Sequence, residues 1–161
     1  MEEDRKPKYM SDGCCCLKFE VMLVNRPAMI AAPFWAQATA EGEICGQGNC
    51  GHIQISAKGL IPCGVYTASF ITDKGNFPAG PREADYTGGG MFPNTLVVNS
   101  EGTLSYYVAP LDFNPLKGIP TTTGCIKITG VAISLHSNCC PGMPEEDVND
   151  QLIAPMCCLR E

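Results

Sequence analysis

The chain has 161 residues, which is the size of one domain with a full hydrophobic core. Its net charge of −6 argues against a nucleic-acid partner, and charged residues make up only 17% of the chain. No apolar run reaches the roughly 18 residues of a membrane span, and the charged first residues do not resemble a signal peptide. The composition predicts a globular domain whose surface is unusually poor in charge.

The first half of the chain predicts short strands separated by turns. Residues 1–16 are charged or cysteine-bearing without periodicity, which predicts a flexible arm. Apolar and polar residues then alternate with a period of two in three segments, which is the pattern of half-buried strands, and a fourth segment, 65–72, is rich in β-branched and aromatic residues. The predicted strands are 17–24, 34–44, 52–60 and 65–72, with a turn-rich link at 45–51.

The second half predicts a hairpin, a last strand and a tail. Residues 94–99 and 103–109 flank Ser100-Glu101-Gly102, which is a hairpin signal. Long connections are expected at 73–93 and 110–124, and a last strand at 125–135. Acidic residues and prolines follow, with one short helix predicted at 147–153.

About seven strands at uneven spacing, without helical periodicity, indicate an all-β fold. We predict a Greek-key antiparallel β-sandwich of the superoxide dismutase-like or immunoglobulin-like kind. The predicted organisation is an arm at 1–16, the sandwich at 17–138 and a cysteine-rich tail at 139–161. Helix should account for less than a tenth of the chain.

Cysteine placement is the most informative feature of the sequence, because seven of the eleven cysteines stand in adjacent runs. Neighbouring Cα atoms lie about 3.8 Å apart, closer than the roughly 4.4 Å that a relaxed disulfide needs, so each member of a run should find its partner elsewhere. We predict bonds between subunits for the runs near the ends, which are Cys14, Cys15, Cys16, Cys139, Cys140, Cys157 and Cys158. We predict bonds within the subunit for the cysteines in or beside strands, which are Cys45, Cys50, Cys63 and Cys125.

A structural metal site is the alternative for part of this set. Cys45, Cys50 and His52 supply thiolates and an imidazole, which zinc accepts, but their spacing matches no standard zinc motif. Disulfides are favoured over metal because the cysteine density indicates an oxidising compartment. The two histidines, His52 and His136, are predicted to be polar residues on a strand face and at a strand end.

Three segments resemble the copper/zinc superoxide dismutase-like sandwich. They are Gly59-Leu60-Ile61-Pro62 leading into residues 65–70, residues 93–102 with an acidic-Gly turn, and Gly130-Val131-Ala132-Ile133-Ser134-Leu135-His136. In that family the last of these motifs is Gly-x-Ala-x-x-x-His, and its histidine binds copper. The resemblance implies a fold, which does not by itself assign a function.

The departures from that family concern the metal ligands. Residues 66–70 lack the His-x-His pair, and residues 73–93 lack the zinc-binding histidines. Dismutase chemistry needs several imidazoles around a redox metal, which one matching histidine does not provide. We therefore predict no dismutase activity, no catalytic residues and no cofactor.

These features favour a structural protein that assembles with copies of itself. We expect an extracellular or cell-surface layer, sheath or filament that is locked by disulfides between subunits, with no membrane span, no nucleic acid and no small-molecule substrate. In this character the chain resembles the disulfide-rich sheath and cell-envelope proteins of methanogenic archaea. The alternative is a metal-binding or redox module on a degenerate dismutase-like fold, for which a cytoplasmic location is open.

Overall fold

The computed structural model describes residues 13–28, 30–79, 95–137 and 149–156. Strands account for 58% of these residues and helices for 7%, and the sheets are antiparallel. The predicted all-β, sandwich-like fold with less than a tenth helix is confirmed. No helix in the described part of the chain is long and apolar enough to cross a membrane.

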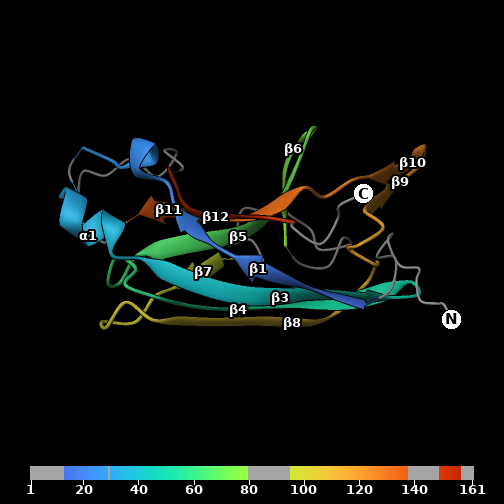
Figure 1. Ribbon diagram of the computed structural model, residues 1–161, viewed down its shortest axis with the longest axis horizontal. Helices are drawn as coiled ribbons and strands as arrows, with labels where there is room; N and C mark the ends of the chain where they lie inside the picture. Colours follow the sequence, from blue (N-terminus) through green and yellow to red (C-terminus); the bar gives the residue numbers. More distant parts are fainter. Residues whose placement is uncertain (1–12, 29, 80–94, 138–148, 157–161) are drawn as a thin grey trace, which may run out of the picture.

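The first sheet has four strands in the order β1 (Gly13–Lys18), β3 (Thr39–Gln47), β4 (Cys50–Lys58) and β8 (Leu104–Leu111). It forms the lower layer in Figure 1, where β3 and β4 run the length of the molecule. Apolar and polar residues alternate along β1 and β4, so one face of this sheet is buried and the other faces solvent.

The second sheet has the order β2 (Glu20–Val21), β12 (Asn149–Pro155), β11 (Gly130–Ser137), β5 (Val65–Thr72) and β6 (Gly75–Pro78), and β7 (Thr95–Val97) also pairs with β5. It forms the upper layer in Figure 1. A separate ribbon pairs β9 (Ile119–Thr121) with β10 (Gly124–Ile126). The helical segments are a short 3₁₀ turn, η2 (Leu23–Asn25), and α1 (Ala32–Ala36).

The core lies between the two sheets. The first sheet contributes Ile44, Ile53 and Ile55, each at most 1% exposed. The second contributes a larger set of fully buried side chains, including Tyr66, Phe70, Val131, Ile133, Leu135 and Leu152. Burial of these apolar surfaces supplies the main favourable free energy of folding.

Two predicted strands near the N-terminus have different bounds in the structure. The strand expected at 17–24 is divided at Phe19, because β1 joins the first sheet and β2 joins the second. The strand expected from residue 34 begins only at Thr39, and α1 precedes it with a proline in its first turn, where proline is tolerated. The predicted arm at 1–16 is also too long, because β1 starts at Gly13.

Two further predictions of local structure are wrong. Strands β7 and β8 do not form a hairpin, because β7 pairs with β5 and β8 pairs with β4, so the turn at 100–102 connects the two sheets. The helix predicted at 147–153 is instead strand β12. Leu152 and Ala154 are buried and pair with Ile133 and Val131 of β11, which favours an extended chain over a helix.

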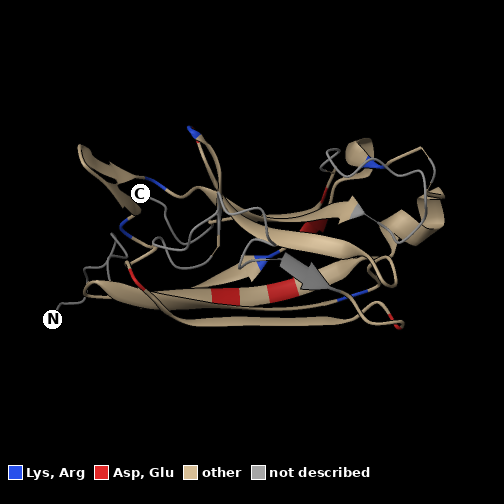
Figure 2. Cartoon of the chain, turned by 180° about the vertical axis from the view of Figure 1, so that it is seen from behind, with Lys and Arg blue, Asp and Glu red and all other residues tan. Residues whose placement is uncertain are grey.

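Charged side chains are sparse along the strands, as Figure 2 shows. Strand β3 carries two of them on its solvent face, Glu41 and Glu43. Exposed large apolar side chains include Leu23, Val24 and Phe34 in and beside η2 and α1, and Tyr107 on β8.

Candidate functional site

Sulfur, carboxylate and imidazole groups meet on the solvent face of the first sheet. In the strand register, Cys14 on β1 lies opposite Cys45 on β3, and Cys45 lies opposite His52 on β4. Glu43 occupies the next row of the same face, opposite Cys16. Directly opposite side chains in antiparallel strands have Cβ atoms about 4.5–5.5 Å apart, so the ladder alone brings these groups together.

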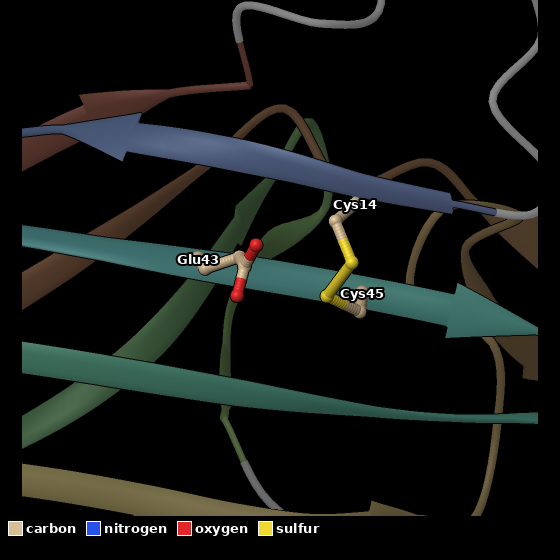
Figure 3. Close-up of side chains that lie close together, drawn as sticks. All are labelled: Cys14, Glu43 and Cys45. Carbon is tan, nitrogen blue, oxygen red and sulfur yellow. A yellow bond between two sulfur atoms is a disulfide. The ribbon is translucent and has the colours of Figure 1, made fainter.

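Cys14 and Cys45 form a disulfide across the two strands (Figure 3), with an S–S distance of 2.06 Å and Cα atoms 4.0 Å apart. We predicted a bond between subunits for Cys14, and this assignment is corrected because its partner is in the same chain. The sequence did not reveal this pair, since the arm was not expected to be a strand. Once β1 pairs with β3, the register places the two sulfurs face to face.

The carboxylate of Glu43 lies beside this disulfide, as Figure 3 shows. An oxygen of Glu43 and the sulfurs of Cys14 and Cys45 all lie within 4.8 Å of one another. Cys14 is exposed, Glu43 is half-buried and Cys45 is 6% exposed. The cluster is therefore reachable from solvent through Cys14, while strand β3 fixes the other two groups.

An open groove of about 560 Å³ borders the disulfide at the end of the first sheet. Its lining includes Cys14, Cys45, Cys50 and His52. The His52 ring lies 5.9 Å from that of Tyr107 on β8, measured between centroids. The structure thus brings the alternative metal set Cys45, Cys50 and His52 into one groove, but the sulfur of Cys45 is held in the disulfide and is not a thiolate ligand in this state.

The remaining described cysteines differ from the predicted pattern. Cys15 is also in a disulfide and is 1% exposed, so its sulfur faces the core and not a neighbouring subunit, which corrects its assignment. Exposed thiols are present at Cys16, Cys50, Cys63 and Cys125. The predicted bonds within the subunit are therefore not found for the last three.

The positions of Cys50, Cys63 and Cys125 in the fold explain why these predicted bonds are not found. Cys50 starts β4 after a hairpin turn, and Cys125 lies in the β9–β10 ribbon. Cys63 lies in the connection from β4 to β5, at the opposite end of the long axis from the β3–β4 hairpin (Figure 1). The predicted links from Cys139, Cys140, Cys157 and Cys158 lie outside the described residues.

A second polar cluster lies on the second sheet, and sequence reasoning missed it. The Thr67 hydroxyl and His136 Nε2 are 2.8 Å apart, and Ser134 donates a hydrogen bond of 2.5 Å to Asp150 Oδ1. Burial lowers the pKa of His136, while the charge of Asp150 acts in the opposite direction. The sequence signal for this cluster was the presence of polar residues at alternate positions of β5 and β11. These two strands pair with each other.

This second cluster is built for packing more than for catalysis. A nucleophile must reach a substrate, but Thr67 is 5% exposed and Ser134 is 1% exposed. His136 was predicted to be a surface residue at a strand end; it lies near the end of β11, but it is half-buried and hydrogen-bonded. It lies on β11 whereas His52 lies on β4, so the two histidines belong to different sheets and do not share one metal.

Comparisons with family models, curated proteins and solved structures find no match for this chain. The resemblances to the dismutase-like sandwich and to sheath proteins therefore remain expectations from the sequence.

Proposed function

We propose that this chain is a structural, self-assembling protein of an extracellular layer, sheath or filament, whose copies are joined by disulfides between subunits. The observation that carries the proposal is the combination of a disulfide within the chain and further exposed thiols on strands and connections. Disulfides persist in oxidising compartments, and exposed thiols there are open to pairing with another molecule.

The location of the exposed thiols suits linkage between copies. The β3–β4 hairpin and the β9–β10 ribbon lie at the same end of the long axis in Figure 1, and Cys50 and Cys125 belong to these elements. The β4–β5 connection, which contains exposed Cys63, lies at the other end. Contacts between unlike ends generate filaments or layers when their rotation does not close into a ring.

The surface composition also supports association. Charged residues make up only 17% of the chain, and Tyr107 on β8 is 63% exposed. Among the described strands, β1 and β8 each pair on one side only, so their outer backbone groups are open to another chain. The predicted linkers Cys16, Cys139, Cys140, Cys157 and Cys158 remain part of this proposal.

The test compares covalent size with and without reductant. The full chain is folded in a glutathione redox buffer, concentrated and run on denaturing gels. We expect a ladder of species that collapses to 17.2 kDa on reduction. Replacing Cys50 and Cys125 together by serine should shorten the ladder, while the matched control Ser56→Ala should not. A clean monomer without reductant at every protein concentration would end the proposal.

A second candidate function is a metal-binding or redox module on a degenerate dismutase-like fold. It is favoured by one observation, the close approach of Cys14, Glu43 and Cys45. The gels described above separate the two functions, because a metal-binding or redox module stays monomeric without reductant.

A further inference from the structure

The potential ligand atoms of Cys14, Glu43 and Cys45 lie within 4.8 Å of one another. All three residues lie on two hydrogen-bonded strands, so regular strand pairing and not a loop sets their spacing. A site placed on regular elements holds its geometry better than one placed on loops.

Their chemistry fits zinc once the disulfide is reduced. Zinc binds thiolate sulfur at about 2.3 Å and carboxylate oxygen at about 2.0–2.2 Å, with tetrahedral geometry. Two sulfurs on such an ion are roughly 3.8 Å apart, and a sulfur and an oxygen are roughly 3.5 Å apart. After reduction the two sulfurs move apart from their bonded 2.06 Å to reach the first separation, and the sulfur–oxygen separation lies within the 4.8 Å that already encloses the group.

His52 is the fourth ligand that the sheet supplies. It lies opposite Cys45 in the register and lines the same groove. Its ring centroid now lies 5.9 Å from that of Tyr107, and the groove borders it. A rotation about its side-chain bonds carries the imidazole toward the sulfurs without moving the backbone.

We infer that reduced Cys14 and Cys45, together with Glu43 and His52, bind one zinc ion, so that this row of the first sheet alternates between a disulfide and a zinc site. In the reductive step a dithiol supplies two electrons and two protons, its own sulfurs form a disulfide, and the Cys14–Cys45 bond breaks into two thiols. Zinc binding then releases these two protons. In the reverse step a disulfide oxidant takes two electrons from the thiolates, the Cys14–Cys45 bond re-forms and zinc leaves.

The geometry gives both the dithiol reductant and the disulfide oxidant access to the two sulfurs. Cys14 is exposed and borders an open groove, so an attacking thiolate reaches its sulfur. Cys45 is 6% exposed and becomes the leaving sulfur, held in place by strand β3. The inference is independent of assembly, since all four residues are in one chain.

The experiment uses cobalt as a spectroscopic probe and zinc as the competitor. The full chain is reduced with a dithiol, freed of that reagent without oxygen, and titrated with Co²⁺. We expect a thiolate-to-cobalt absorption band that is lost when Cys14 and Cys45 are replaced by serine, and that zinc displaces. The matched control Cys63→Ser/Cys125→Ser should retain it.

Two milder variants keep the test decisive if the double serine variant unfolds. Glu43→Gln and His52→Ala both retain the disulfide, and each should weaken zinc binding at least tenfold, since even outer-shell partners of a ligand are worth about 10–100-fold in affinity. Glu41→Gln, one row away on β3, is the control and should leave the affinity unchanged. An unchanged zinc affinity in both Glu43→Gln and His52→Ala, or a cobalt band that survives the loss of Cys14 and Cys45, would overturn the inference.

Discussion

The Tyr66 hydroxyl on β5 donates a hydrogen bond of 2.6 Å to Oε1 of Gln151 on β12, across the intervening strand β11. The same hydroxyl accepts the N–H of Ile61 at 2.9 Å, and Gln151 Nε2 donates to the Trp35 carbonyl at 3.0 Å. The Trp35 indole in turn donates to the Met22 carbonyl at 2.9 Å. This chain of hydrogen bonds ties two connections to the second sheet: the β4–β5 connection, through Ile61, and the segment that carries η2 and α1, through Trp35 and Met22.

Replacing Tyr66 by phenylalanine should lower the free energy of unfolding by about 1–3 kcal/mol, because Gln151 Oε1 and the Ile61 N–H lose a buried partner. Burial raises the pKa of Tyr66 well above its usual range, so the hydroxyl remains a donor at all working pH values. Urea unfolding measures the change. Tyr107→Phe, at an exposed position, is the control, and equal midpoints for the two variants would refute the role of the network.

Removing the Cys14–Cys45 disulfide with the Cys14→Ser/Cys45→Ser variant should cost about 2–4 kcal/mol of stability. The bond joins residues 31 apart in sequence, so it restricts the unfolded chain, and it also fastens the edge strand β1 to β3. Guanidinium unfolding under non-reducing conditions gives the value. Cys125→Ser serves as control, and a double variant as stable as this control would show that the bond contributes nothing.

His136 should make stability depend on pH below its ordinary pKa of 6.5. Burial lowers its pKa in the folded state, so between the folded and unfolded values the unfolded chain binds more protons. Stability is then full above about pH 6.5 and falls as the pH drops toward the folded value. In the His136→Gln variant, the unfolding midpoint should change less with pH in this window. The assignment fails if both proteins show the same pH dependence there.

Gly46 on β3 should not tolerate alanine, because a Cβ there would stand 1.8 Å from Asn114 Oδ1. The Asn114 side chain also donates to the Gly48 carbonyl and accepts from the Leu116 N–H, both at 3.0 Å, so it has little freedom to move. We expect Gly46→Ala to destabilise the fold by about 1–3 kcal/mol.

A double-mutant cycle checks the cause of that loss. In an Asn114→Ala background the same Gly46→Ala change should cost clearly less, since the clashing oxygen is gone. Thermal unfolding of the four proteins gives the coupling. Additive effects would mean that the clash with Asn114 is not the reason.

The sequence by itself determined the elements that alternate strongly or are rich in β-branched and aromatic residues. Strand β5 (Val65–Thr72) was predicted with the bounds that the structure has, and the prediction for β4 was off by two residues at each end. Alternation is a local property, because every second side chain of a strand faces the core whatever strand lies beside it. The all-β class and the scarcity of helix follow from the same pattern.

Only the tertiary structure decided which strands pair, and with them the candidate site. Residues 147–153 look helical in isolation, yet β12 is extended because β11 offers it a ladder of partners. Cys14 looked like part of an arm, yet strand β1 sets it opposite Cys45, with Glu43 one row away. Register is a relation between segments distant in sequence, and it is fixed by the joint burial of two apolar faces, which no local pattern contains.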